Sequence, residues 1–503
     1  MSRPGGRPSG GRPSNGRPSG GRSSGGRPPG GRPATQRSAQ APAERARRTD
    51  PSRQAAFDVL RAVDEEDAYA NLALPAVLRR RRVQGRDAAF ATELAYGALR
   101  GKGLYDAVIA RCVDRPLDRI DPPVLDVLRL GAHQLLAMRV PTHAAVSESV
   151  ALARSAVGAG AGGFVNAVLR RVSEHDVDGW VAEVAPARES DLVGHLAVAR
   201  SHPAWVVRAM REALVAHGRD VGELEDLLTA DNARPVVSLA ARPGLSEVAE
   251  LVDAGARPGH WSPLAAELPA GDPGALEAVR TGRARVQDEG SQLAALTLLA
   301  ADVQGRDERW ADLCAGPGGK AALLAAVAAQ RGAALTAVES APHRTRLVEQ
   351  ALQGTPGSWQ VRTGDGRELG AEEPEGYDRV LVDVPCTGLG ALRRRPEARW
   401  RRTPADLPAL APLQRALLDS ALDAVRPGGV VAYVTCSPHP AETLAVVDDV
   451  VRRRGDVSLL DAPGMLREAA GREVPGAGDA DTVQLWPHLH GTDAMFVALL
   501  RRG

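Results

Sequence analysis

From about residue 285 to the end of the chain, short β-branched runs alternate with longer stretches of helical periodicity, and this alternation constrains the fold most. Residues 378–384 (DRVLVDV) and 429–436 (GVVAYVTC) are apolar runs ended by Pro, Gly or Ser, as is typical of parallel strands buried on both faces. Repeated strand–helix units predict an α/β domain built on a doubly wound, mostly parallel sheet of the Rossmann-like kind. We expect strands at 309–314, 334–339, 358–362, 378–384, 429–436 and 494–500, and helices at 319–330, 342–352, 410–425 and 441–453.

The preceding part of the chain has a different pattern. Ala55, Val59, Leu60 and Val63 recur at helical spacing, and similar apolar stripes follow up to residue 172. The stripes predict an all-α domain over residues 51–172, with helices near 87–99, 104–113, 122–138, 144–158 and 163–172. Residues 173–285 are expected to form a linker and a small α+β subdomain, with helices at 203–217 and 222–230 and a strand at 235–241. The α/β domain then occupies residues 286–503.

Charge is distributed unevenly along the 503 residues. Residues 1–50 hold 11 arginines against two acids, which leaves 52 basic and 60 acidic side chains elsewhere, although the whole chain has a formal net charge of +1. Gly-Gly-Arg-Pro-Ser repeats with small variations from Arg3 to Arg32, and residues 1–50 contain too few apolar groups to offset the entropy of ordering, so we expect a disordered tail. Such an arm suits a polyanion, and a solubilising extension without a specific partner fits equally well.

The sequence contains no apolar signal-peptide core and no run of 18 apolar residues, so we expect a cytoplasmic protein without a membrane partner. Thiols stay reduced in that compartment, which argues against disulfides. No C-x-x-C or paired-histidine spacing is present, and no metal site is expected.

Cys386 and Cys436 lie just past two of the predicted strands. Ligands of open α/β sheets bind outside the carboxyl ends of the strands, so both thiols should open into one crevice. That arrangement suggests chemistry by a thiolate. A buried cysteine can also serve as a small hydrophobic residue, and this alternative stays open for each thiol taken alone.

A glycine-rich loop follows the first strand of the sheet, in Asp312–Lys320 (DLCAGPGGK). Its glycines permit a tight turn and close approach of a ligand to the start of the next helix. It is not a P-loop, and it fits the dinucleotide pattern only loosely. Glu339, at the end of the second strand, is placed to hold ribose hydroxyls, and Asp365 and Asp383 follow the third and fourth strands. Lys320 is one of only two lysines in the chain, against 61 arginines, which favours a site-specific role.

The stretches Asp312–Lys320, Asp383–Gly388 and Tyr433–Ser437 resemble the motifs of the S-adenosylmethionine-dependent RNA cytosine-5 methyltransferases, the Sun/RsmB family. Residues 286–291 (VQDEGS), 393–400 and 491–498 are similar to further segments of that family, and 52–172 resembles its NusB-type RNA-binding domain. Val384, Thr387 and Val434 depart from the common residues but leave both thiols and the acid in place.

The resemblance implies a reaction and a set of site residues. Cys436 would be the nucleophile that attacks carbon 6 of cytosine, and Cys386 would assist release after carbon 5 has taken the methyl group. Asp383 would hydrogen-bond the base, and Lys320 would lower a thiol pKa or orient the base. The cofactor-binding residues would be Cys314, Ala315, Gly316, Pro317, Gly318, Gly319, Lys320, Glu339, Arg344, Asp365 and Asp383.

The expected partner is RNA, most simply ribosomal RNA of the small subunit, bound by a monomeric enzyme. Arg393, Arg394, Arg395, Arg399, Arg401 and Arg402 are candidates for the phosphate contacts, with a solvated loop as the alternative. Transfer RNA is a second possible substrate. A non-catalytic RNA-binding or antitermination scaffold is another function class, and a dinucleotide-dependent dehydrogenase would leave the cysteine pair unexplained.

Overall fold

The computed structural model describes residues 49–478 and 480–503. The expected disordered tail lies almost entirely outside these residues. Within them, no helix is both long enough and apolar enough to cross a membrane.

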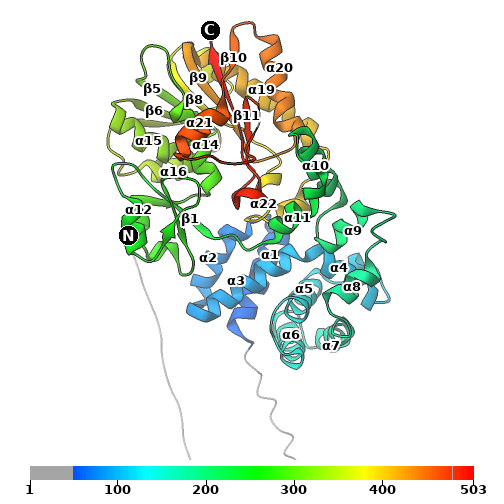
Figure 1. Ribbon diagram of the computed structural model, residues 1–503. Helices are drawn as coiled ribbons and strands as arrows, with labels where there is room; N and C mark the ends of the chain where they lie inside the picture. Colours follow the sequence, from blue (N-terminus) through cyan, green and yellow to red (C-terminus); the bar gives the residue numbers. More distant parts are fainter. Residues whose placement is uncertain (1–48, 479) are drawn as a thin grey trace, which may run out of the picture. The chain divides into compact units, whose positions relative to one another are not determined.

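The first part of the described chain is all helical, as predicted (Figure 1, blue to cyan). Asp50 starts it by accepting hydrogen bonds from the backbone N–H groups of Ser52 and Arg53, which caps the first helix. One apolar cluster, from Ala55 to Trp180, forms its core. The helices are α1 (Pro51–Glu65), α2 (Ala70–Arg81), α3 (Gly85–Arg100), α4 (Lys102–Cys112), α5 (Pro122–Leu136), α6 (Thr142–Ala156) and α7 (Ala161–Val172), with a 3-10 helix at Leu117–Arg119.

The middle region continues the helical part before it becomes a small sheet. Helices α8 (Val177–Val184), α9 (Leu192–Ala199), α10 (Ala204–Ala216) and α11 (Leu224–Asn232) precede an antiparallel sheet with the order β2-β3-β1-β4. Its strands are β1 (Val237–Ala241), β2 (Arg257–Pro258), β3 (Ala265–Leu268) and β4 (Ala284–Val286), with α12 (Val248–Asp253) and α13 (Glu277–Arg280) beside them. The expected helices at 203–217 and 222–230 and the strand at 235–241 match α10, α11 and β1.

The last part contains the large sheet. Its path is β10-β12-β9-β8-β5-β6-β7, and β11 pairs with β12. Neighbours from β9 to β7 are parallel, whereas β10, β11 and β12 pair antiparallel. The strands are β5 (Arg309–Leu313), β6 (Ala334–Glu339), β7 (Ser358–Thr363), β8 (Tyr377–Asp383), β9 (Val425–Thr435), β10 (Val457–Leu459), β11 (Thr482–Gln484) and β12 (Phe496–Arg502).

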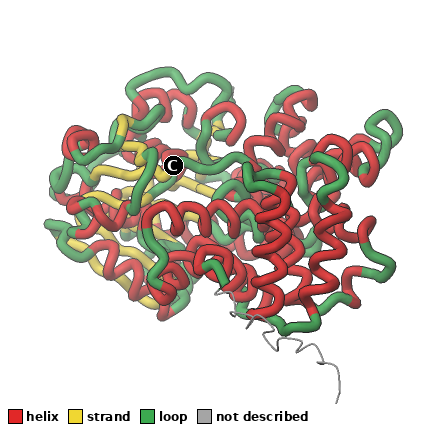
Figure 2. The backbone as a smooth tube through the Cα atoms, turned by 90° about the horizontal axis from the view of Figure 1, so that it is seen from below, coloured by secondary structure: helices red, strands yellow, loops and turns green. Residues whose placement is uncertain are grey.

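Helices cover both faces of this sheet, which confirms the doubly wound α/β prediction (Figures 1 and 2). One apolar cluster joins one face to α14, α15, α16 and α21, and a second joins the other face to α19 and α20. These helices are α14 (Glu289–Ala300), α15 (Gly319–Arg331), α16 (Pro342–Leu352), α19 (Asp406–Ala424), α20 (Leu444–Arg453) and α21 (Ala462–Ala470), with the short α17 (Leu369–Glu372), α18 (Ala398–Arg401) and α22 (Pro487–His490).

Candidate functional site

The site lies where the chain reverses direction across the large sheet. From β5 the chain moves outward through β6 to β7, and it then returns to place β8 on the other side of β5. A crevice outside the carboxyl ends of β5 and β8 is the usual ligand position in such a sheet. The glycine-rich loop leaves β5 there, Asp383 ends β8, and Cys436 follows β9 directly.

The two thiols predicted to share a crevice lie side by side. The Sγ atoms of Cys386 and Cys436 are 3.4 Å apart, and the four cysteines are free thiols. A hydrogen bond from the Cys386 thiol lowers the pKa of Cys436, and Lys320 acts in the same direction, against burial and the nearby Asp383. The same shared hydrogen bond, together with burial, raises the pKa of Cys386 well above its usual range. The pair therefore favours one thiolate, at Cys436.

Lys320 and Asp383 form an ion pair beside these thiols, with Nζ and Oδ2 2.8 Å apart. Burial alone would lower the pKa of Lys320, but the charge and hydrogen bond of Asp383 outweigh it and raise that pKa. Lys320 therefore stays a cation at neutral pH. A cation at this point stabilises negative charge on Cys436 and cannot act as a base.

Two side chains, one at the end of β6 and one on α16, hold the glycine-rich loop in place. Glu339 accepts a hydrogen bond from the N–H of Gly316 at 3.0 Å, and Arg344 donates to the Gly316 carbonyl at 2.6 Å. A Cβ atom at Gly316 would lie 2.3 Å from Oε2 of Glu339, so any other residue there would displace the side chain that holds the loop. Gly318, with a φ of 102°, caps the start of α15. The loop thus presents backbone at the amino end of a helix of 13 residues.

Cys314 and Asp365 differ in how they relate to this loop. Cys314 adopts a φ of 62° at its start, and burial raises the pKa of its thiol, which is inert in that state. Asp365 forms an ion pair with Arg367 in the turn after β7. Of the predicted cofactor residues, Glu339, Arg344 and Gly316 contact one another, as do Lys320 and Asp383, whereas Asp365 is tied to its own turn.

The sequence analysis did not single out Asp312, the second-last residue of β5, as a site residue. Its side chain is fully buried, and neither carboxylate oxygen has a hydrogen-bond partner among the described residues. Burial, followed by the charge of Asp383, raises its pKa well above the usual range. Orphaned buried oxygens beneath a glycine loop suit a bound ligand with amino or hydroxyl donors. The sequence signal was present, since Asp312 opens the DLCAGPGGK motif, but a strand-end acid also occurs in structural roles.

Comparison with known proteins identifies the family. The family model of the 16S rRNA methyltransferase RsmB/F matches residues 296–501, and that of the NusB family matches residues 50–174. A putative methyltransferase of Mycobacterium tuberculosis is 53% identical over 459 residues, which cover 91% of this chain and 98% of that protein. The ribosomal RNA small subunit methyltransferase B of Erwinia tasmaniensis is 30% identical over 89% of this chain and 97% of its own.

The chain belongs to the RsmB/F family of 16S rRNA methyltransferases. The crystal structure of PH0851 has the same fold, with a TM-score of 0.73 at 22% identity, covering 90% of this chain and 99% of its own. Family membership implies S-adenosylmethionine as the methyl donor, and it removes the support for a dehydrogenase. The glycine cradle at Gly316 and the orphaned oxygens of Asp312 fit a donor that carries an amino group and ribose hydroxyls.

Three of the arginines that the sequence suggested for phosphate contacts are held by protein partners. Arg399 is fully buried and donates to the carbonyls of Ser201 and Asp231 and to the side chain of Asn232. Arg393 is also buried, near Asp288, and Arg394 pairs with Asp493. These side chains hold segments of the protein together and are occupied by protein partners.

Two further members of the run, Arg395 and Arg401, contact the helical part, whereas Arg402 pairs with Asp406 in its own segment. The guanidinium groups of Arg395 and Arg401 lie 5.0 and 5.2 Å from the ring centroid of Tyr69. Arg401 also donates to the carbonyls of Val63 and Ala68 at 2.7 and 2.6 Å. The sequence could not reveal this, because an arginine-rich loop looks the same whether its partner is RNA or protein.

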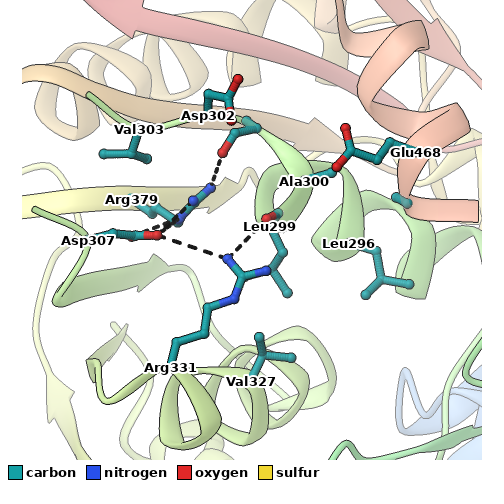
Figure 3. A pocket seen from close by; sticks show the side chains of 12 residues that line it. Leu296, Leu299, Ala300, Asp302, Val303, Asp307, Val327, Arg331, Arg379 and Glu468 are labelled. Carbon is teal, nitrogen blue, oxygen red and sulfur yellow. Dashed lines mark hydrogen bonds and ion pairs between the residues drawn. The ribbon is translucent and has the colours of Figure 1, made fainter. Parts of the chain in front are cut away.

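A cavity lies away from the thiols. It has a volume of about 510 Å³ and lies near Arg331, Arg379 and Asp307 (Figure 3). Asp307 precedes β5 and Arg379 is the third residue of β8, so the cavity lies toward the amino-terminal ends of these strands. Arg379 is already paired with Asp307 at 2.8 Å and donates to the carbonyls of Leu298 and Ala301. Among the described residues, no group of three His, Cys, Asp or Glu side chains could hold a metal ion.

Proposed function

We propose that this protein transfers a methyl group from S-adenosylmethionine to carbon 5 of a cytosine in small-subunit ribosomal RNA, through a covalent bond to Cys436. The observation that carries the proposal is the pair of thiols 3.4 Å apart, beside the Lys320–Asp383 ion pair and the glycine-rich loop. Carbon 5 of cytosine is too electron-poor to take a methyl group directly, so a nucleophile must first add to carbon 6.

The attack step uses the thiolate that the pair favours. The sulfur of Cys436 forms a bond to carbon 6, and the electron pair of the carbon 5–carbon 6 double bond moves into the ring. Asp383 and Lys320 lie where they can hydrogen-bond the polar edge of the base and stabilise that negative charge. The Gly316 loop, Glu339 and Asp312 would hold S-adenosylmethionine, which would supply the methyl group for carbon 5.

Release of the product needs a base that takes the proton from carbon 5. Once Cys436 is bonded to carbon, Cys386 has lost its hydrogen-bond acceptor, and its proton passes to solvent. The resulting thiolate takes the proton from carbon 5, the double bond re-forms, and the carbon 6–sulfur bond breaks with its electron pair returning to Cys436. The net products are methylated cytosine, S-adenosylhomocysteine and one proton, and both cysteines return to their starting states, so the reaction balances.

The NusB-type part supports an RNA substrate, and the names of the curated relatives favour ribosomal RNA over transfer RNA. A base in folded RNA must leave its stack to reach a crevice at a strand end, so an unpaired or easily opened nucleotide is the preferred target. A non-catalytic scaffold would need neither two thiols in hydrogen-bond contact nor an ion pair beside them.

A gel assay for covalent protein–RNA adducts tests the proposal. Cys386→Ala, incubated with 16S ribosomal RNA and S-adenosylmethionine, should accumulate an adduct that Cys436→Ala and the double variant lack. Cys112→Ala is the matched control, because this thiol is buried in the helical part. Total transfer RNA in place of ribosomal RNA tests the alternative substrate. If no variant forms an adduct although S-adenosylmethionine binds, the two-thiol mechanism is wrong and the scaffold function gains support.

A further inference from the structure

The turn that carries Cys386 is held by a buried carboxylate that follows Cys436 in sequence. Glu442, in the 3-10 helix Pro440–Glu442, has a fully buried side chain. It accepts the N–H of Thr387 at 2.8 Å on Oε1 and the hydroxyl of Thr387 at 2.5 Å on Oε2. Thr387 directly follows Cys386, so Glu442 fixes the backbone on one side of that thiol.

A second residue holds the other side. Gln414 of α19 donates from Nε2 to the carbonyl of Pro385 at 2.9 Å and to Oε1 of Glu442 at 3.2 Å. Tyr433 of β9 completes the arrangement, because its hydroxyl donates to the Glu442 carbonyl at 2.7 Å. The residues before and after Cys386 are thereby tied to one carboxylate, and through it to the strand that leads to Cys436.

Burying the Glu442 carboxylate costs more free energy than burying a neutral side chain at this position would. Among residues 49–478 and 480–503, no lysine, arginine or histidine lies within ion-pair distance of Glu442, and its hydrogen-bond donors are all neutral. Burying an ion without a counter-ion is costly, and a neutral glutamine could hydrogen-bond the same partners, with its carbonyl accepting and its amide donating. A retained charge beside a reactive thiol points to function rather than to folding.

We infer that Glu442 is a positioning residue for Cys386: it fixes the thiol opposite Cys436 through Thr387, and its charge disfavours a second negative charge at Cys386. The role in turnover rests on the proposed two-thiol function. During attack, Cys386 then remains a thiol that donates to Cys436. During release, the fixed turn keeps the Cys386 sulfur beside the carbon atom from which it takes a proton.

Several other titratable groups lie around Cys386 and Glu442; among them is His439, at the start of the same 3-10 helix, whose pKa is lowered, first by burial. Cys436 faces it from the end of β9, and Tyr433 of the same strand is a buried phenol whose pKa is raised well above its usual range, first by burial. From α19, Gln414 is neutral and Arg415 is paired with Asp449 at 2.7 Å. Asp383 and Lys320 act on Cys436 and pair with each other.

Glu442→Gln separates charge from position. A glutamine can keep its carbonyl where Oε1 accepts from Thr387 and Gln414, and its amide can donate to the Thr387 hydroxyl, which also accepts. Glu442→Ala removes both contacts and charge. Because Glu442→Ala can fail to fold, Thr387→Val and its rescue by Thr387→Ser form a second pair. Glu373→Gln, a carboxylate at the opposite edge of the sheet, is the control.

The first measurement is the pH profile of iodoacetamide alkylation at Cys386 and Cys436 in the folded full chain, read by mass spectrometry without RNA. Cys436 should react at lower pH than Cys386 in the wild type. Glu442→Gln should move the Cys386 midpoint down by about one pH unit, because a like charge has been removed. Glu373→Gln should leave it in place.

The second measurement is the covalent adduct with 16S ribosomal RNA and S-adenosylmethionine. Glu442→Ala and Thr387→Val should trap roughly tenfold more adduct than the wild type, because a misplaced base slows release, and Thr387→Ser should restore the wild-type level. If Cys386→Ala traps an adduct while the Glu442 variants change neither alkylation nor trapping, the inference is wrong. If alkylation shifts but Cys386→Ala traps nothing, the hold of Glu442 on Cys386 stands and the proposed function fails.

Discussion

Lys320 illustrates what a single residue contributes to the site. In the proposed mechanism the nucleophile is the Cys436 thiolate, whose fraction rises with pH through the pKa of Cys436, and Lys320 is one of the groups that lower this pKa. Lys320→Met should move the acid limb of the activity profile to higher pH by about one unit, with about a tenfold loss at pH 7. Activity should recover on the alkaline side. The measurement is kcat/KM as a function of pH.

The chain offers a matched control for this substitution, because Lys102 is its other lysine. Lys102 lies in the helical part near Asp64, so Lys102→Met should leave the acid limb unchanged. A loss of activity that is equal at every pH would contradict a role in thiolate stabilisation, and it would assign Lys320 to binding of the base instead.

At the level of residues, the sequence predicted the thiol pair well and its supports poorly. Cys386 and Cys436 each follow a buried parallel strand, and strands of one sheet bring their carboxyl ends together, so their 3.4 Å contact follows from topology. Glu442 gave no such signal. An acid just before a helix resembles an ordinary helix-start residue, and its contact with Thr387 joins residues 55 positions apart.

The loop between β5 and α15 gives the clearest test at the level of elements. A Cβ atom at Gly316 would overlap Glu339 and lie 2.7 Å from Nε of Arg344. Gly316→Ala should therefore displace both side chains and weaken S-adenosylmethionine binding at least tenfold, a loss of about 1.4 kcal/mol. Isothermal titration calorimetry measures this directly.

Gly332→Asn is a suitable comparison, since Gly332 caps the far end of the same helix in a left-handed conformation and no atom lies within 4 Å of its added Cβ. Unchanged affinity in Gly316→Ala would mean that the methyl donor does not use this loop.

Element prediction succeeded where the pattern was periodic and failed where it was not. The six expected strands of the large sheet match β5 to β9 and β12 within a few residues at their ends. Helix α2 was missed, because Pro75 and the following arginines interrupt its apolar stripe. Helix α14 was missed because it is buried on nearly every side and has no polar face. Strand β11 has only three residues and pairs only at an edge.

The end of α2 is the better candidate for phosphate contact now that Arg393 and Arg399 are known to be buried. Arg79 to Arg82 are all exposed there, and Arg80 and Arg81 share Asp58. Replacing Arg79 and Arg82 by alanine should weaken RNA binding and reduce the slope of log affinity against log salt by about 1.5 to 2. Filter binding across salt concentrations measures both.

Arg452→Ala with Arg453→Ala removes the same charge from α20 and should change neither affinity nor slope. Equal effects of the two double variants would mean that RNA binding responds to net charge rather than to α2.

On the scale of the whole molecule, the helical part and the catalytic part have separate apolar cores. The arginine-rich segment that follows Cys386, residues 393–402, is one of the connections between the two parts. Glu397 accepts the N–H of Ala70 at 3.0 Å, and Arg401 donates to carbonyls between α1 and α2. If the helical part binds RNA, the bound RNA would therefore act on the loop that leads back to Cys386.

Arg401→Ala should loosen this joint and leave each core intact. Three hydrogen bonds from a charged group to backbone carbonyls are lost, a cost of about 2 to 4 kcal/mol after partial replacement by water. Because separate cores unfold together only if their interface is strong enough, calorimetry should show the helical part unfolding in an earlier transition of its own.

Arg402→Ala is the control, since Arg402 contacts Asp406 within its own segment. Affinity for S-adenosylmethionine should stay the same in both variants, whereas turnover on RNA should fall only in Arg401→Ala. A single unshifted transition with normal turnover would show that the two parts do not depend on this contact.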